Sequence, residues 1–484
     1  MNGFQIVVLW SDALLGVLLL ALGAGIVAAT RREHLRRAWS AVFASRVAMA
    51  SLVVLTAYVL VAVLDSFHFR PALETADAPT PGATRYSVEV LSLLDVALGT
   101  LRAGREQSYS APLATHGFEK RMQVLADGRR ERVQPRLLFG GAHLADPAQG
   151  RATDIAFRVL GGVFGGVLAW TVLVLLIAWL AARPAGEGTL ATLKAMLRGR
   201  TAVAWDALAW SLLGVLTVSG ALYAVAAGWH VFGTDATGND VLYQSLKAMR
   251  IALLIGTLAS FVVLPLGIGL GLIAGYFGGW IDDLIQYVYT VISSIPYVLL
   301  IAAAALMMQL VIEQNSVMFD TAAARADARL VALCVIIGAI SWTTLCRLLR
   351  AETLKLRETD YVQAARCFGV SSVRIMLRHI LPNAFHIVLI MMVLEFSGLV
   401  LAEAVLSYVG VGVDPTTISF GTMINKARGE LARDPLIWWS ITAAFVFMVT
   451  LVLAANLFAE AVREAFDPRA VVPKRRRALP PEAT

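Results

Sequence analysis

The run IALLIGTLASFVVLPLGIGLGLIAGY, residues 251–276, decides the class of this fold. It contains no charged side chain. A hydrocarbon layer of about 30 Å needs roughly 20 mainly apolar residues per helix, because the backbone must satisfy its own hydrogen bonds in lipid. The run therefore predicts a helix that spans a membrane.

The rest of the chain repeats this pattern. Of its 484 residues 58% are hydrophobic and 15% are charged, whereas a typical soluble domain has about 25% charged residues. Eight further runs pass the same length test, near 4–29, 47–64, 155–182, 202–228, 284–312, 328–348, 385–409 and 436–458. The sequence thus predicts an all-α polytopic membrane protein with nine crossings, and excludes a water-soluble fold.

The placement of the basic residues predicts the orientation. The net charge is +7, and most Lys and Arg residues lie at the ends of apolar runs, which argues for a lipid bilayer and against a nucleic acid as partner. The first run has no basic residue before it and is followed by Arg31 and Arg32, so it is expected to be a retained anchor with its N-terminus outside. Segments 31–46, 183–201 and 349–384 and the tail at 470–484 are rich in Lys and Arg and are expected inside.

The long segment 65–154 is then expected outside. Asp127-Gly128, between two short strand-like stretches, is a hairpin signal. A helical stripe is formed by Leu91, Leu94, Leu98 and Leu101 and ends near Gly104. These features predict a small extracytoplasmic α+β lobe, for which a packed cap with no ligand of its own is the simpler interpretation.

Small residues recur on one face of the 251–276 helix. Four glycines stand four residues apart, at Gly267, Gly271, Gly275 and Gly279. Such spacing lets helices approach closely in lipid. We interpret this face as a helix-packing surface.

Two acidic residues fall within the predicted crossing at 385–409. Glu395 and Glu403 are eight residues, or about 80°, apart around a helix, so both can face one interior groove. A charge at the bilayer centre costs at least about 2.5–3.5 kcal/mol. A pathway or gate role and a purely structural hydrogen-bonded role remain equally open.

Known catalytic and ligand-binding patterns are missing from the sequence. None of the seven histidines forms a His-x-x-x-His pair, and no Gly-x-x-x-x-Gly-Lys-Ser/Thr loop occurs. We therefore expect no catalytic residue, no metal site and no nucleotide site in this chain. Any use of ATP must come from a partner.

The inner segment RAETLKLRETDYVQAARCFGVSSVRIMLRHILPNAF, residues 350–385, is the most informative. Asp360 is expected to cap a short helix over 361–368, with Gln363 in a capping-box contact and Gly369 as a left-handed stop. Ser371 is expected to cap a second helix that Pro382 ends. With Ala364 and Ala365 exposed, the first helix is interpreted as a docking knob for a partner; an amphipathic hairpin on the membrane surface is the alternative.

Here the sequence resembles a known family. QAARCFG, followed by HILP, resembles the "EAA" loop of binding-protein-dependent ABC importer permeases, and RHILPNA is similar to the dipeptide, oligopeptide and nickel subfamily. GTDATGNDVL from Gly233, LAEAVLSYVGVG, DPTTISFGTMI and the FDPR at Phe466 resemble further signatures of that subfamily. By this resemblance the ATPase-coupling residues are Asp360, Gln363, Ala364, Ala365, Gly369, Leu381 and Pro382.

The resemblance also implies an architecture. Residues 202–469 would form the six-helix permease core, with a coupling loop at 350–382 and a basic cytoplasmic tail at 470–484. It would be preceded by two extra crossings in 1–64, the lobe at 65–154, and a third extra crossing with an inner linker at 155–201. Three positions depart from the family pattern: Gln363 replaces Glu, Asn239 replaces Arg and Phe420 replaces Trp.

Implied partners are a second, unlike permease subunit, two cytoplasmic ATPases that bind ATP and Mg²⁺, and an extracytoplasmic solute-binding protein. The implied location is the bacterial cytoplasmic membrane. Import of dipeptides or oligopeptides is the expected function, although the sequence does not identify the cargo. An ion-coupled secondary transporter and a membrane sensor or scaffold are the competing interpretations.

Overall fold

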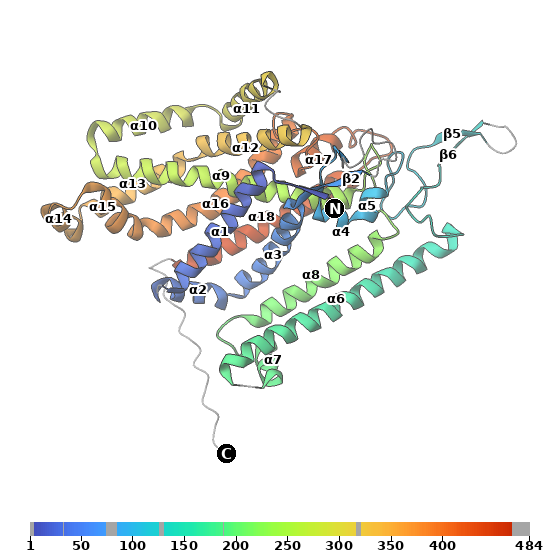
Figure 1. The fold of residues 1–484 in the computed structure, drawn as a ribbon, viewed down its shortest axis with the longest axis horizontal. Coiled ribbons are helices and arrows are strands. Elements are labelled where there is room, and N and C mark those ends of the chain that lie inside the picture. Colours follow the sequence, from blue (N-terminus) through green and yellow to red (C-terminus); the bar gives the residue numbers. More distant parts are fainter. Residues whose placement is uncertain are drawn as a thin grey trace, which may run out of the picture.

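Long helices run roughly side by side through the protein, with short helices at one end and a small sheet lobe at the other (Figure 1). The structure is a computed structural model that describes residues 4–31, 33–73, 85–124, 130–186, 188–315 and 321–466. Within these residues, eight helical segments are long and apolar enough to cross a bilayer, at Arg46–Ser66, Gly150–Arg183, Trp205–Ala226, Val241–Phe277, Tyr297–Gln314, Ala322–Arg357, Ser372–Val409 and Trp439–Phe466. All eight overlap predicted crossings, which confirms the all-α polytopic fold.

The first predicted crossing is wrong at its start. Phe4–Val7 form strand β1, which pairs antiparallel with β2 (His68–Leu73). Helix α1 begins only at Trp10 and runs to Arg31, which is about 33 Å of helix. The physical reason is the nearby edge of β2, whose backbone groups pair with those of β1. Helices α2 (Glu33–Ala44) and α3 (Arg46–Ser66) follow.

The α+β lobe is present as predicted. Strand β2 pairs with β3 (Arg85–Tyr86) and β4 (Leu91–Ser92), and β5 (Arg121–Val124) forms a hairpin with β6 (Arg130–Val133). The turn predicted at Asp127-Gly128 lies outside the described residues, as does the basic tail predicted at 470–484.

The leucine stripe is not one helix. It is divided between β4 and two short helices, α4 (Leu93–Ala97) and α5 (Gly99–Ala103), because Leu98 leaves the helical conformation at φ −103° and ψ 26°. Gly104 ends α5, near the predicted stop. The three leucines at 94, 98 and 101 are buried against the membrane helices, which fixes the lobe to the bundle.

Helices α6 (Pro147–Ala185) and α8 (Trp205–Ala226) form an antiparallel pair beside the main bundle, joined by α7 (Thr189–Leu197) (Figure 1). The pair is very close: a Cβ atom on Gly162 or on Gly166 would collide with the α8 backbone. Trp170 Nε1 donates a hydrogen bond of 2.6 Å to the carbonyl of Ala209 across the pair.

The main bundle is built around α9 (Val241–Phe277), with α12 (Ala322–Ser341), α13 (Thr343–Arg357), α16 (Leu381–Val409) and α18 (Trp439–Phe466) packed on it. Short α17 (Phe420–Ala427) covers α16 and α18. The fully buried side chains of the main bundle come from several helices and include Leu254, Ile255, Ile337, Leu399 and Leu451. Phe420, at the position where the family favours Trp, is also fully buried and belongs to the same buried cluster as Trp439.

The predicted crossing at 284–312 is two helices instead of one. Helix α10 (Gly279–Ser294) ends before Pro296, and α11 (Tyr297–Gln314) begins after it. Ile295 is extended, at φ −89° and ψ 135°, as is usual for a residue before proline. Pro296 therefore breaks the helix within the predicted run.

Candidate functional site

The short helix predicted over residues 361–368 is present as α14, residues Asp360–Cys367, at one end of the molecule (Figure 1). The capping prediction is wrong by one residue. Thr359 is the N-cap, at φ −76° and ψ 146°, and Asp360 is already the first helical residue. The predicted capping box between Asp360 and Gln363 is not formed: the N-cap Thr359 makes no side-chain cap hydrogen bond, and its Oγ1 donates to the Leu356 carbonyl at 2.5 Å. Gln363 Nε2 instead donates to the Glu358 carbonyl at 3.2 Å.

The predicted stop at Gly369 is confirmed. Gly369 has φ +73°, the left-handed conformation that glycine adopts without steric cost. Its flanking amides close the helix end: Phe368 N donates to Ala364 O at 3.0 Å, and Val370 N donates to Ala365 O at 3.1 Å. The chain therefore reverses directly after α14.

The two faces of α14 differ. Val362 and Ala365 are buried in a cluster that also contains Tyr276 of α9, so the prediction that Ala365 is exposed is wrong. Ala364 is exposed, as predicted. Phe368, which the sequence interpretation did not single out, is 86% exposed. The spacing of three between Val362 and Ala365 was the available signal, since it places both on the same face of a helix.

Pro382 does not end the second helix. Ser371 is the N-cap of α15 (Ser372–Ile375), as predicted, though its side chain makes no cap hydrogen bond. A π-helical turn over Met376–Ile380 leads directly into α16, where Pro382 lies in the first turn. A proline there is tolerated because its missing N–H would have no partner in any case.

Leu381 stands at this junction. It is half-buried and packs against both the cluster under α14 and the cluster between α9 and α13. Leu381 therefore connects the packing of α14 to that of the membrane helices α9 and α13.

The glycine face of α9 packs against α13, the helix that leads into α14. A Cβ atom at Gly267, Gly271 or Gly275 would lie within 2.9 Å of atoms of α13. Gly279 does not belong to this face, because α9 ends at Phe277 and Gly279 starts α10 with φ +56°. Arg350 of α13 also binds Asp282 of α10, with Nη2 2.7 Å from Oδ2. Helix α13 is therefore held on two sides.

The two acidic residues of α16 lie in different surroundings. Glu403 is 1% exposed, and its Oε1 accepts hydrogen bonds from Ser407 at 2.6 Å and Ser419 at 2.8 Å. Ser419 is also the N-cap of α17, so Glu403 helps to hold that helix. Glu395 is half-buried and forms no hydrogen bond with another described residue.

At the other end of the molecule, the GTDATGNDVL stretch starts α9. Asp240 caps the helix, with Oδ1 accepting from Tyr243 N at 3.0 Å, while its Oδ2 lies 2.7 Å from His230 Nδ1. Glu106 of the lobe lies 3.3 Å from His230 Nε2. Asn239, in place of the family's Arg, donates through Nδ2 to Thr237 Oγ1 at 2.7 Å. The sequence interpretation missed Glu106 and His230, because their contact joins residues 124 positions apart.

Burial alone would lower the pKa of His230 and raise that of Glu106. For both residues, the effect of hydrogen bonds on the pKa outweighs the effect of burial. Asp240 and Glu106 raise the pKa of His230 to about 9. Contacts from His230 and from three backbone amides hold the pKa of Glu106 below its ordinary value.

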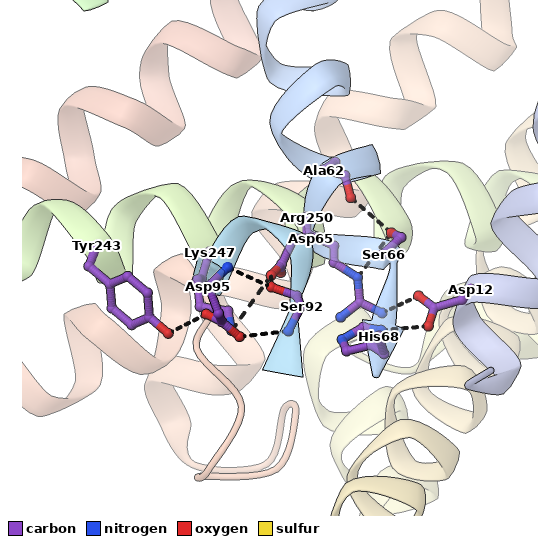
Figure 2. A network of polar contacts seen from close by, with 10 residues as sticks. All are labelled: Asp12, Ala62, Asp65, Ser66, His68, Ser92, Asp95, Tyr243, Lys247 and Arg250. Atoms are coloured by element: carbon purple, nitrogen blue, oxygen red, sulfur yellow. Dashed lines mark hydrogen bonds and ion pairs between the residues drawn. The ribbon is translucent and has the colours of Figure 1, made fainter. Parts of the chain in front are cut away.

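A polar cluster on the next turns of α9 joins this helix to the N-terminal segment (Figure 2). Lys247 Nζ lies 2.8 Å from Asp95 Oδ1, and Tyr243 donates to the same oxygen at 2.6 Å. Arg250 Nη2 donates to Asp12 Oδ1 at 2.6 Å. A basic side chain costs about 2.5–3.5 kcal/mol at the centre of a membrane helix. The acidic partners of Lys247 and Arg250 offset part of the cost of removing these two charges from water.

Asp12 is shared by two cationic or polar partners. Its Oδ2 lies 2.8 Å from His68 Nδ1 of strand β2, opposite the Arg250 contact. Ser66 and Ser92 complete the cluster: Ser66 Oγ accepts from Arg250 Nε at 3.2 Å, and Ser92 donates to Asp65 at 2.7 Å.

Within the described residues, no group of three or more His, Cys, Asp or Glu side chains is arranged to hold a metal ion. The candidate site comprises α14, the packing of α9 against α13, and the polar contacts at the N-terminal end of α9.

Comparison with known proteins gives these elements a family. The profile described as "Binding-protein-dependent transport system inner membrane component" matches residues 267–472. The oligopeptide transport system permease protein OppC of Mycobacterium tuberculosis is 32% identical over 239 residues, which cover 49% of this chain and 76% of that protein. OppC of Haemophilus influenzae is 32% identical over 242 residues, covering 50% of this chain and 71% of that protein.

The dipeptide transport system permease protein DppC of Lactococcus lactis is 29% identical over 241 residues, covering 50% of this chain and 64% of that protein. A solved inward-facing structure of the MetNI methionine ABC transporter aligns with 46% of this chain and 97% of that chain, at 16% identity and a TM-score of 0.36. The chain belongs to the family of binding-protein-dependent transport system inner membrane components, and it is a multi-pass permease subunit of an ATP-driven importer.

Proposed function

We propose that this chain is one of two unlike permease subunits that together form a peptide import pathway. Two ATPases would bind ATP and Mg²⁺ on the α14 side, and a solute-binding protein would deliver cargo on the lobe side. The observation that carries the proposal is α14: a short helix with one buried face, one exposed face and a fixed reversal at Gly369.

The proposed orientation places α14 in the cytoplasm and the lobe outside. It is supported by the basic residues of segments 31–46, 183–201 and 349–384, which would then all lie inside. It is also supported by the shape of the molecule, in which α14 and the lobe lie at opposite ends of the long helices (Figure 1). The N-terminus would be outside and the C-terminus in the cytoplasm.

In this proposal ATP binding closes the two ATPases and displaces α14. The close contact of α13 with Gly267, Gly271 and Gly275 makes α9 and α13 follow α14 together. The attached crossings would then tilt and open the pathway to the outside. Residues Asp360, Gln363, Ala364 and Phe368 would present the docking surface, while Ala365, Leu381 and Pro382 would support it from below.

Peptides are the proposed cargo because the relatives that match at 32% identity are described as oligopeptide permeases. Glu395 is the better candidate for a pathway residue, since it is half-buried and has no hydrogen bond to another described residue. Glu403 would act as a gate only by moving α17, because its carboxylate binds the N-cap of that helix.

Purification in mild detergent with identification of the subunits that co-elute tests the proposal. The complex, reconstituted with its binding protein, is expected to hydrolyse ATP faster when a bound peptide is present, and to accumulate that peptide. A complex without an ATPase, or uptake that persists after ATP depletion and follows an ion gradient, would contradict it.

A further inference from the structure

Helix α9 runs along the main bundle, from the side of α14 and α15 towards the sheet lobe (Figure 1). Its 37 residues correspond to about 56 Å of helix. At its inner end, Leu272 and Tyr276 share a buried cluster with Val362 and Ala365 of α14. At its outer end it carries the polar cluster described above. The same helix thus contacts the docking element and the lobe.

The outer contacts are ion pairs whose acidic partners are buried. The Arg250 and Asp12 side chains are each 9% exposed, and Asp95 beside Lys247 is 3% exposed. Both acidic partners come from the N-terminal part of the chain, outside the segment 267–472 that matches the family profile. That part of the chain therefore supplies the counter-charges for Arg250, which is buried, and for Lys247, which is half-buried.

The first turn of α1 reaches α12 as well. Ser11 N donates to Asp327 Oδ2 of α12 at 3.2 Å, and Ser11 Oγ accepts from Arg250 Nη2 of α9 at 3.1 Å. One turn of helix thereby connects the outer ends of two core helices to each other.

Pro265 interrupts the hydrogen-bond ladder of α9 at one position. Close packing on both sides spans this position. A Cβ on Gly338 of α12 would meet Val262 at 2.5 Å, and a Cβ on Gly267 would meet Leu345 of α13 at 2.7 Å. Helices α12 and α13 therefore pack against α9 on either side of Pro265 along the chain.

We propose that α9 is a strut that makes the lobe move with α14 as one body, with Asp12 and Asp95 as the positioning residues of its outer end. The drive for this motion rests on the proposed function. The ATPase cycle then moves the lobe on the outer side of the membrane. The N-terminal segment moves with the rest of the subunit.

Pulsed electron paramagnetic resonance on the whole complex tests this. One spin label is placed on native Cys367, which is exposed on α14, and a second on Ala97→Cys, which is exposed on α4. Cys334 and Cys346 are buried. We expect one narrow distance that is the same without nucleotide and with trapped ATP. A shift of this distance between the two states would overturn the proposal.

Variants test the positioning residues. Asp95→Asn and Asp12→Asn are expected to broaden the distance distribution and to cause loss of uptake with ATP hydrolysis retained. Glu89→Gln, which removes the more exposed pair with Arg102 in the same lobe, is the matched control and is expected to behave as wild type. An unchanged distribution and full uptake in both Asp variants would overturn the proposal.

If the wild-type complex lacks ATP-driven uptake, the proposed function fails. A distance that changes in a complex with ATP-driven uptake overturns only the proposal that α9 is a strut.

Discussion

Phe368 projects from the end of α14 with 86% of its surface exposed. Aromatic anchors that enter a partner's pocket dominate many interfaces, and burying such a side chain stabilises by about 1.5–3 kcal/mol. We predict that Phe368→Ser lowers ATP-driven uptake about tenfold, which corresponds to about 1.4 kcal/mol, without changing the melting temperature. Uptake and thermal unfolding of the purified complex measure the two effects.

Val88→Ser is the matched control, because Val88 is 84% exposed but lies in the lobe. It is expected to retain full uptake. Equal uptake by both variants would show that Phe368 does not dock an ATPase.

His230 makes the stability of the lobe contact depend on pH. Its pKa is raised from 6.5 to about 9 by Asp240 and Glu106, against the effect of burial. A group with a raised pKa contributes stability that is full below its unfolded pKa and is lost as pH rises through the folded pKa. We predict that the melting temperature falls between pH 6.5 and pH 9, and that His230→Gln removes this fall. A wild-type melting temperature that is flat over this range would contradict the contact.

At the scale of elements, the contact between α9 and α13 depends on single glycines. A Cβ at Gly271 would lie 2.8 Å from the Cys346 carbonyl, whereas a Cβ at Gly269 meets nothing within 4 Å. Overpacking costs about 1–3 kcal/mol. We predict that Gly271→Val lowers the melting temperature and the yield of folded protein, while Gly269→Val, on the same helix, does neither. Equal stability of the two variants would refute this packing.

The sequence predicts the membrane helices well because each is specified by its own apolar length. It predicts their interruptions poorly. Pro296 breaks a predicted crossing, whereas Pro382 sits within a continuous helical segment. Pro296 follows an extended residue, Ile295, whereas Pro382 lies in the first turn of α16. The apolar runs in the sequence do not reveal this difference. Strand β1 was missed for a similar reason, since its partner β2 lies more than 60 residues away.

At the scale of the whole molecule, local pattern predicted helix α14 and its stop at Gly369, but not which face of the helix is buried. Ala365 is buried in a cluster that brings together residues of α9, α14, α15 and the π-helical turn. The anchors at the other end were also beyond prediction from local pattern: Asp12 and Arg250 are separated by 238 positions. Charged residues near helix ends are common, and only the tertiary fold assigns their partners.

The central claim is that another chain drives this protein through α14. Cross-linking from native Cys367, exposed on that helix, tests it most directly in membranes that import cargo. The adduct is predicted to contain an ATPase subunit, and its yield is predicted to change when ATP is trapped. A membrane with full ATP-driven uptake in which labelled Cys367 captures no ATPase would contradict the claim.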